Sequence, residues 1–563
     1  MRARAGTAWC TLAVAALAAC RGGDAAVADA IRGAASAERA PDYVPAPRWK
    51  LVKRIYQQRE YRALWTSGGK PTGRARELVD ALCHAEREGL NPAQYGLDDL
   101  RRQLHRIRGE KERTPAEIAE LELRLTGMFT EYGGDLLAGR LDPAAVDSGW
   151  YIRARRSSVD STLAAAAGGR DFGDMVAPLV PRQPEYRELL QALGRYRQLL
   201  AAGGWAKVPG GGPLRPGSSG PRVAALRDRL AAMGDLESAA GEPAYDREVA
   251  RAVSRYQVRH GLEANGVVGP ATFAALDVPL ERRIRQIELN LERYRWLPAE
   301  FGARYILVNI PDYRLYAFEG GKQLFEQRVI VGGEYENATP VFMDSMTYVV
   351  FNPDWDVPKR ILVDEMMPHL RDDPAYLARN GYEVVDRKGD SVLDATKIDW
   401  GDVDTAQMPF RVRQLPGLRN PLGRVKFMFP NQFSIYLHDT PSQELFDRSK
   451  RTLSHGCVRV ENPLRLASFV LAGQRDWGED EIRAAMQPPK PAPGDSAAIT
   501  KEKVVKLERP VPVYLLYLTA YVRDGVLQFR DDPYDRDGRA MARLGKLPPA
   551  DPERCKELQE LMK

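Results

Sequence analysis

The sequence predicts a multidomain α+β protein, with helical modules in its N-terminal half and a mostly β, sandwich-like domain after them. Apolar residues recur at helical spacing from Arg48 to about Ala202, as at Leu78 and Leu82. From Tyr305 onward the pattern changes to alternation with a period of two, in short runs separated by turns, which indicates strands. A chain of 563 residues is also too long for a single core, so we expect about three or four modules.

The first residues are typical of an export signal. Met1 to Arg4 is a short basic segment, and Thr7 to Ala19 is an apolar run too short to span a bilayer. The string Leu-Ala-Ala-Cys that ends at Cys20 resembles the lipobox of bacterial lipoproteins, so we expect residues 1–19 to be a signal peptide and Cys20 to be lipidated, with ordinary cleavage near Ala19 as the alternative. We expect an exported, periplasmic protein anchored by lipid to the outer membrane of a Gram-negative bacterium. The Ala-, Gly- and Pro-rich residues 20–47 predict a flexible tether.

Two helical units precede the strands. The first extends over residues 48–205, and the composition shifts to Gly, Pro and Ser at residues 203–221, which marks a linker. The second unit, residues 206–280, has two apolar helical stripes and then a turn at Asn265-Gly266 before a third short helix. An amphipathic helix over residues 281–299 connects this unit to the strands.

The strands belong to a domain over residues 300–540. Helical and loop-like sequence interrupts them at residues 358–420, and a long insertion inside a sheet domain is typical of a lid over a site. Residues 541–563 form a C-terminal tail. Strand-like runs occur at residues 305–310, 314–318, 325–331, 347–351, 424–429 and 433–437.

Charge and cysteine content exclude several classes of protein. With 82 basic and 76 acidic side chains the formal net charge is +6, and no basic stripe or recognised motif indicates a nucleic-acid partner. Beyond Cys20, the cysteines Cys83, Cys457 and Cys555 are too few for a disulfide framework, although a bridge between Cys83 and Cys555 stays open. Cys83 lies on an apolar helical face, whereas Cys555 lies in a charged helix that would leave it exposed. No zinc-ligand pattern is present, so we expect catalysis without a metal or cofactor.

The residues best suited to chemistry lie around Cys457. It follows His455 and Gly456 directly, and His438 lies nineteen positions earlier. A cysteine reacts as the thiolate, and a reference pKa of roughly 8.5 leaves few thiols ionised at neutral pH unless a base is near. Glycine would let the backbone turn so that successive N–H groups point at an oxyanion. The alternative is a small buried cysteine beside an unrelated histidine.

The wider string decides between these interpretations. It resembles the signature of L,D-transpeptidases with a YkuD-type catalytic domain, in which a histidine, a gap of somewhat under twenty residues and Ser/Thr-His-Gly-Cys precede an aliphatic residue, an arginine and a nearby asparagine. The resemblance extends to a helical scaffold over residues 48–205, a peptidoglycan-binding module over residues 206–280, and a capping insertion over residues 358–420. The matching positions are His438, Ser454, His455, Gly456, Cys457, Val458, Arg459 and Asn462.

The resemblance implies a role for each site residue. Cys457 is the expected nucleophile, His438 the general base, and the Asp439 carbonyl the group that orients the imidazole. The N–H groups of Gly456 and Cys457 would hold the oxyanion, and Tyr436, two residues before His438 on one strand face, is either a further donor or an ordinary packed aromatic. The remaining residues are expected at the substrate, with a bracing role for Arg459 left open: Arg459, His455, Ser454 and Asn462.

The implied function is peptidoglycan cross-linking. Cys457 would attack the peptide bond between the L-centre and the D-centre of a tetrapeptide stem, and a diamino acid of a second stem would capture the acyl group as a 3-3 cross-link. The partners would be the donor and acceptor stems, with the membrane reached only through lipid. The alternatives are capture by water in an L,D-carboxypeptidase, capture by a protein lysine in a wall-protein ligase, and a non-catalytic wall-binding lipoprotein.

Overall fold

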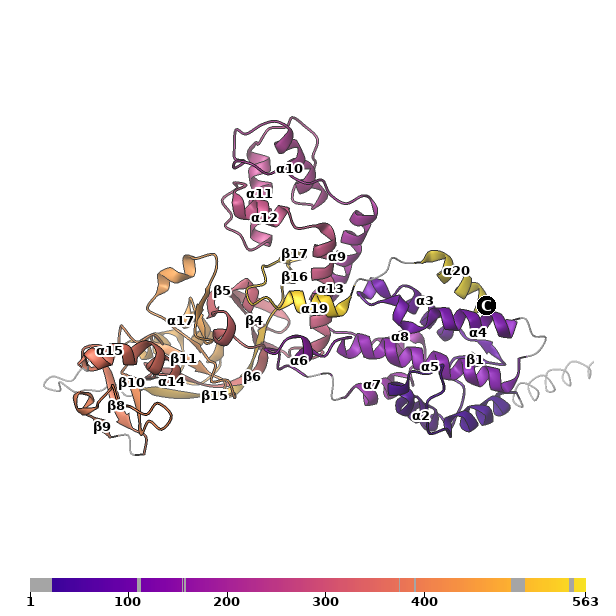
Figure 1. The fold of residues 1–563 in the computed structure, drawn as a ribbon, viewed down its shortest axis with the longest axis horizontal. Helices are drawn as coiled ribbons and strands as arrows, with labels where there is room; N and C mark the ends of the chain where they lie inside the picture. Colours follow the sequence, from indigo (N-terminus) through magenta and orange to yellow (C-terminus); the bar gives the residue numbers. More distant parts are fainter. Residues whose placement is uncertain are drawn as a thin grey trace, which may run out of the picture.

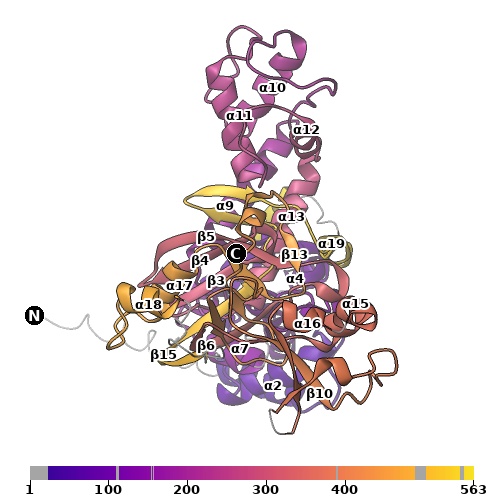
Figure 2. The same cartoon turned by 90° about the vertical axis from the view of Figure 1, so that its left-hand side faces the viewer.

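The computed structural model describes residues 23–108, 113–153, 155, 158–373, 375–388, 391–487, 502–545 and 551–563. The expected signal peptide over residues 1–19 and the expected lipidation of Cys20 lie outside this part of the chain. Three arms meet at the centre of the molecule: the N-terminal helices, the mostly β domain on the opposite side, and a small helical module that projects away from both (Figures 1 and 2). Within the described ranges, no helix is long and apolar enough to cross a membrane.

The N-terminal arm is a bundle of helices around α5 (Pro115–Ala138). This helix begins with a complete capping box, because Thr114 Oγ1 accepts a hydrogen bond from the Glu117 N–H at 3.3 Å and the Glu117 carboxylate accepts one from the Thr114 N–H at 2.8 Å. The helical pattern predicted from Arg48 onward is confirmed here. Packed on the largely buried α5 are α2 (Trp49–Gln58), α3 (Gly73–Cys83) and α4 (Leu97–Arg108).

The described part of the expected flexible tether is folded. Residues 23–35 form a helix, and Val27 and Ile31, four positions apart, are buried in the core of the N-terminal arm. The Gly and Pro content suggested flexibility, but alanine has the highest helix propensity, and the two apolar residues give this helix one face to bury. The segment is therefore part of the N-terminal arm.

The C-terminal tail returns to the same core. Helix α20 (Pro552–Leu561) packs on α3 and α4 and buries Leu558 and Leu561. Cys555 is 5% exposed and lies against Cys83, so the expectation of an exposed Cys555 is wrong. Burial raises the pKa of both thiols, and both are free in this structure. The last helix of the chain thus packs its apolar side chains against helices that lie near the N-terminus of the sequence.

The projecting module is a three-helix unit with its own small core. Its helices are α10 (Pro221–Ala232), α11 (Arg247–Arg259) and α12 (Pro270–Leu276). The turn before α12 is closed by Asn265, whose Oδ1 accepts hydrogen bonds from Val267 N–H at 3.0 Å and from Gln257 Nε2 at 3.1 Å. This residue therefore supplies the turn that was predicted from the sequence.

The expected connecting helix is α13 (Leu280–Trp296), and it fixes the arms relative to one another. It contacts α5 of the N-terminal arm, α9 (Pro184–Ala201) and α19 (Asp537–Leu544). Its second half is buried and includes charged residues, so these residues need partners. Arg293 supplies one such pair, at 2.7 Å from the buried Asp537 carboxylate.

The strand pattern predicted after residue 300 is confirmed as a nine-stranded sheet, except at residues 433–436, which form a turn and loop before β12. The order is β13-β5-β14-β12-β11-β6-β15-β3-β4, and β5 also pairs with β4, so the sheet closes on itself around the core of this domain. Parallel pairs occur at β12–β14, β13–β5 and β15–β3 among antiparallel neighbours. The strand bounds are β3 Arg304–Asn309, β4 Arg314–Glu319, β5 Lys322–Gly332, β6 Phe342–Phe351, β11 Val425–Met428, β12 Leu437–His438, β13 Thr452–Ser454, β14 Val458–Val460 and β15 Lys503–Leu516.

The insertion between β6 and β11 forms a separate cap with its own core. Its helical part agrees with the prediction and consists of α14 (Lys359–Ile361), the π-helical turn η7 (Leu362–Met366), α15 (Met367–Asp372) and α16 (Tyr376–Arg379). The cap also contains a small sheet that was not predicted, because its strands are too short to show a clear alternation. That sheet has the order β7 (Trp355–Asp356), β10 (Phe410–Gln414), β8 (Tyr382–Asp386) and β9 (Val392–Leu393).

Candidate active site

The site is built on two short parallel strands, β12 and β14. Their register pairs Leu437 with Val458 and His438 with Arg459. Leu437 and Val458 are fully buried, so they face the core. Because side chains alternate along a strand, His438 and Arg459 share the opposite face. The positions just before the paired residues, Tyr436 and Cys457, lie on that same outer face. The sheet therefore brings together four of the predicted site residues.

The loop that carries Cys457 is held by a chain of hydrogen bonds. Gly456 has φ +121°, in the region that favours glycine. Ser454 Oγ accepts from the Gly456 N–H at 3.1 Å and donates to the Cys457 carbonyl at 2.5 Å. On the other side, Thr339 Oγ1 donates to the Gly456 carbonyl at 2.7 Å. The loop that carries Cys457 is thus held by hydrogen bonds within the loop and by one hydrogen bond from the connection between β5 and β6.

The close approach of that connection requires a second glycine. A Cβ atom on Gly332 would lie 1.9 Å from the Asn337 carbonyl oxygen and 3.0 Å from Gly456 Cα. The Gly332 N–H donates to Thr339 Oγ1 at 2.8 Å. Sequence reasoning missed Thr339 and Gly332 as site supports, although the pair Gly332-Gly333 directly after a strand is typical of a close backbone approach.

Cys457 is a neutral thiol in this environment. Its Sγ donates to the Ser434 carbonyl at 3.7 Å, and Tyr436 lies beside it. Burial raises the pKa of the thiol to about 11, although hydrogen bonds from the backbone and side chain of Tyr436 act in the opposite direction. Burial likewise raises the pKa of Tyr436, which keeps its hydroxyl protonated and able to donate.

His438 is a neutral imidazole in contact with backbone carbonyls. Its Nδ1 lies 2.6 Å from the Asp439 carbonyl, and since a carbonyl only accepts, this contact places a proton on Nδ1. The Pro421 carbonyl also interacts with the imidazole. Burial, followed by the charge of Arg459, lowers the pKa of the imidazole to about 3. Among the described residues, no hydrogen bond joins His438 to Cys457. The structure therefore supports a neutral Cys457 thiol and a neutral His438 imidazole in the resting site, and not a preformed thiolate.

Arg459 is a cation without an ionic partner among the residues described. It is half-buried, its Nε is buried and makes no hydrogen bond, and burial lowers its pKa. Of the two roles left open from the sequence, bracing of the loop through backbone carbonyls has no supporting contact. The guanidinium is instead available to an anion on the face that also carries Cys457.

Two predicted substrate contacts are structural hydrogen bonds. Asn462 caps α17 (Pro463–Val470), because its Oδ1 accepts from the Arg465 N–H at 3.0 Å, and its own N–H donates to Gln327 Oε1 at 3.1 Å. Ser454 is occupied within the loop, as described above. Both side chains therefore hold the local structure of the site, and a contact of either residue with substrate stays a prediction.

His455 joins the nucleophile loop to the cap. Its Nε2 lies 2.8 Å from Glu365 Oε1 in η7, and an ion pair joins Arg360 of the cap to Glu336 of the β5–β6 connection at 2.8 Å. The acidic partners were not predicted, since nothing local in the sequence marks them. π-Helical turns such as η7 occur preferentially at functional sites.

Family models match three segments of the chain. They are a scaffold domain at residues 50–193, a domain described as "Putative peptidoglycan binding domain" at residues 219–276, and the YkuD L,D-transpeptidase catalytic domain at residues 303–483. The last segment contains Cys457, His438 and the cap.

Similar proteins carry related descriptions. A Haemophilus influenzae protein described as "Putative L,D-transpeptidase" is 36% identical over 253 residues, which is 45% of this chain and 48% of that protein, so the match spans about half the length of the relative. A crystal structure of the L,D-transpeptidase (residues 123-326) from Xylanimonas cellulosilytica covers 55% of this chain and 99% of its own at 17% identity and a TM-score of 0.17, a value too low to carry an argument about the fold. Residues 303–483 thus match the YkuD model of L,D-transpeptidase catalytic domains, in one polypeptide with segments that match a scaffold domain and a domain of the peptidoglycan-binding type.

Proposed function

We propose that this protein is a peptidoglycan L,D-transpeptidase that forms 3-3 cross-links between tetrapeptide stems through an acyl-enzyme on Cys457. The observation that carries the proposal is the shared outer face of β12 and β14, where a thiol, an imidazole, a phenol and a guanidinium without an ionic partner among the described residues lie within a few positions of one another. The matches to the catalytic-domain model and to the peptidoglycan-binding model support peptidoglycan as the substrate.

The first step is attack on the donor stem. The Cys457 thiol hydrogen turns from the Ser434 carbonyl to His438 Nε2, and the sulfur attacks the carbonyl of the L-to-D peptide bond. The C–N bond then breaks, His438 returns the proton to the leaving amine of the terminal D-residue, and a thioester remains. Because both groups start neutral, the ion pair forms only during the reaction.

The developing oxyanion needs donors that are free in the resting site. Gly456 was expected to supply one, but its N–H is already bound to Ser454 Oγ. The Cys457 N–H, which has no partner among the described residues, and the Tyr436 hydroxyl are the better candidates. A donor of this kind lowers the barrier by roughly 3 kcal/mol in other acyl-transfer enzymes.

Arg459 gives the site its preference for an anionic stem. A guanidinium binds a carboxylate through two parallel hydrogen bonds, and its half-buried position strengthens that interaction relative to one in water. In a stem peptide the free carboxylates flank the scissile bond, so this contact would set the register of the donor. The second step then transfers the acyl group from sulfur to the side-chain amine of a diamino acid, with His438 removing the amine proton.

The compartment follows from the same activity. Peptidoglycan stems lie outside the cytoplasmic membrane, so an enzyme acting on them must be exported. The basic and apolar N-terminal segment and Cys20 are consistent with a lipid-anchored periplasmic protein.

The test is muropeptide analysis of purified sacculi treated with the wild-type chain and with Cys457→Ala. The proposal expects new dimers joined through the third residues and free terminal D-amino acid with wild type only. Loss of the terminal residue without dimers would instead identify an L,D-carboxypeptidase, and a covalent adduct on a protein lysine would identify a wall-protein ligase. No change of any kind would contradict the proposal.

A further inference from the structure

A large cleft lies between the catalytic loop and the projecting three-helix module. Its volume is about 1620 Å³, larger than the roughly 300–1,000 Å³ of most small-molecule pockets. Its walls come from several separate parts of the chain, among them residues 146–151, residues 258–264 of the three-helix module, residues 311–314, the loop around Glu334, the loop around Lys450, and residues 530–539. His455 and Gly456 are also part of the lining, so the cleft reaches the loop that carries Cys457.

The walls of the cleft are rigidly joined through Arg530. This buried side chain pairs with Asp312 in the β3–β4 turn at 2.5 Å and donates to the Arg259 carbonyl at the end of α11 at 3.0 Å. Next to it, His260 stacks between Tyr256 and Phe529. The three-helix module is therefore in direct contact with the domain that contains the sheet, and one of its faces lines the cleft.

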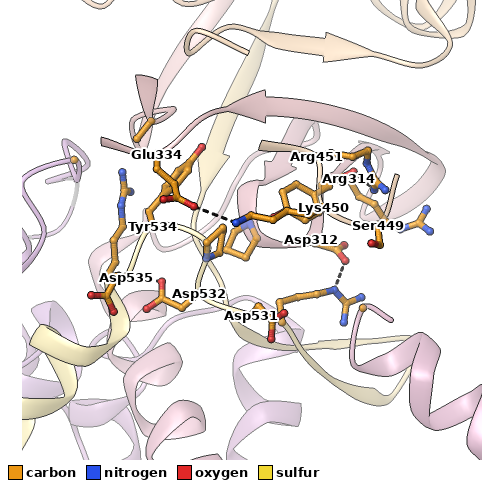
Figure 3. A pocket seen from close by; sticks show the side chains of 18 of the residues that line it. Asp312, Arg314, Glu334, Ser449, Lys450, Arg451, Asp531, Asp532, Tyr534 and Asp535 are labelled. Carbon is orange, nitrogen blue, oxygen red and sulfur yellow. Dashed lines mark hydrogen bonds and ion pairs between the residues drawn. The ribbon is translucent and has the colours of Figure 1, made fainter. Parts of the chain in front are cut away.

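The cleft is lined by charged side chains of both signs, and its acidic segment also contains Arg530, Arg536 and Arg539. Figure 3 shows Arg314, Lys450 and Arg451 along one side and Asp531, Asp532 and Asp535 along the other. Many of the charges are used within the protein: Lys450 pairs with Glu334 at 3.0 Å, and Asp532 accepts from the Tyr517 hydroxyl at 2.5 Å. Glu334 and Lys450 thus form an ion pair within the lining of the cleft.

Other charged side chains at the cleft make no ion pair with the described residues. Asp531, Asp535 and the Arg448 side chain are exposed and make no ion pair with any of the described residues. The buried His260 also lines the cleft, and although its Nδ1 lies 2.8 Å from the Tyr256 carbonyl, its Nε2 has no partner in the described part of the chain. With Nδ1 donating, Nε2 is an unused acceptor at the end of the cleft formed by the three-helix module.

We infer that this cleft binds the second peptide stem, the acceptor. The inference rests on the proposed function and adds where the attacking amine comes from. A stem with a free diamino acid is a zwitterion, with an ammonium group and several carboxylates along an extended chain. Its ammonium group fits beside Asp531 and Asp535, and its carboxylates fit at Arg448 and at Lys450, which would exchange its ion pair with Glu334 for the stem. The three-helix module at the far end would hold the strand from which that stem extends.

The test separates acceptor binding from donor chemistry. Cys457 of the full chain is first blocked with a carbapenem, which occupies the donor position, and a tetrapeptide stem without sugars is then titrated in by calorimetry. Two double variants each remove two charges from the cleft. One combines Asp531→Asn with Asp535→Asn and removes two negative charges, and the other combines Arg448→Gln with Lys450→Gln and removes two positive charges. Asp480→Asn with Arg475→Gln, both exposed and outside the cleft lining, serves as the matched control.

Loss of charge-assisted hydrogen bonds should weaken tetrapeptide binding about tenfold in each cleft variant and leave the control unchanged. The rate of the carbapenem adduct should stay within about twofold of wild type, while dimer yield from sacculi falls about as much as binding does. Binding and dimer yield equal to wild type in both cleft variants would overturn the inference.

Failure of the proposed function would look different. If no adduct forms on wild-type Cys457, the first step has failed, and the titration on the unblocked chain still decides whether the cleft binds the stem. If adducts form but wild type yields no dimers, the transfer step has failed, and the effect of the cleft variants on binding stands by itself.

Discussion

His455 Nε2 lies 2.8 Å from Glu365 Oε1, and this pair joins the loop of the nucleophile to the π-helical turn of the cap. The cap is inserted between two strands of the catalytic sheet and has its own hydrophobic core. The contact between His455 and Glu365 holds this cap against the loop that carries Cys457.

Glu365→Gln should loosen the cap without unfolding it. Both side chains of the pair are about half exposed, so the loss of stability should be below about 1 kcal/mol. Hydrogen exchange in residues 359–373 should become faster, while exchange in the nine-stranded sheet stays constant. Glu479→Gln, which breaks an exposed pair with Arg483 away from the cap, is the matched control. Unchanged exchange in the cap would show that this pair does not hold it.

Gly456→Ala should inactivate the enzyme through the backbone. At φ +121° a side chain is strained, and the added Cβ would lie 3.1 Å from Ile435 Cδ1, so we expect a loss of about 1–3 kcal/mol and a displaced Cys457 N–H. Carbapenem acylation should fall by at least about a hundredfold, in line with removal of an oxyanion donor. Gly525→Ala provides the comparison, since Gly525 also has a positive φ but open space around it. That variant should lose stability and keep acylation, and equal acylation by both would contradict the role given to Gly456.

The titration of His438 predicts how stability depends on acid. Its pKa is lowered to about 3 in the folded protein and is roughly 6.5 in an unfolded chain, so between these values the unfolded state binds more protons. The free energy of unfolding should fall by about 1.4 kcal/mol for each pH unit across this window as the pH decreases. His438→Gln should remove that part of the slope, measured by urea unfolding from pH 7 to pH 4. Parallel curves for wild type and variant would contradict a neutral buried imidazole.

Cys457 should affect the free energy of unfolding at alkaline pH. Its pKa is raised to about 11, above the roughly 8.5 of an unfolded cysteine, so the folded state holds the proton more strongly. Stability should be fully present below about pH 8.5 and decline as the pH rises toward 11. Cys457→Ser removes this contribution, and the difference between the two proteins should grow only above about pH 8.5. A difference that grows below pH 8 would indicate a thiolate in the resting enzyme.

The last helix should stabilise the N-terminal arm. Leu558 is fully buried between α20 and the helices of that arm, so Leu558→Ala should cost about 2–5 kcal/mol. Val526→Ala, at a residue that is 48% exposed, should stay within about 0.5 kcal/mol of wild type. The comparison is made by urea unfolding followed by hydrogen exchange in α3 and α4. No loss for Leu558→Ala would mean that α20 does not pack there in solution.

Helices, the main strands and the nucleophile motif were predictable because their determinants are local. The periodicity of apolar residues and the spacing from His438 to Cys457 can be read directly from the chain. One predicted strand, over residues 433–437, fails for a local reason as well: Asn431 Nδ2 binds the Phe429 and Ile435 carbonyls, and Ser434 has φ +55°, so a turn forms before β12. Side-chain hydrogen bonds of this kind compete with strand pairing.

The remaining features depend on contacts between distant segments. Glu365 and Thr339 reach the nucleophile loop only after the sheet has closed, and nothing beside them in the sequence marks them as partners of His455 and Gly456. The occupation of the Gly456 N–H by Ser454, and the lack of any partner for Arg459 among the described residues, are also consequences of packing. The sequence indicated which residues gather around Cys457, and the structure shows which of their groups are already hydrogen-bonded.

The most direct test is an acid-quenched reaction of the full chain with a disaccharide tetrapeptide, followed by mass spectrometry of the peptide that contains Cys457. The account predicts a thioester whose mass equals the donor minus its terminal D-residue, absent in Cys457→Ala and formed at least about a hundredfold more slowly in His438→Ala. An adduct on another residue, or acylation of His438→Ala at the wild-type rate, would contradict it.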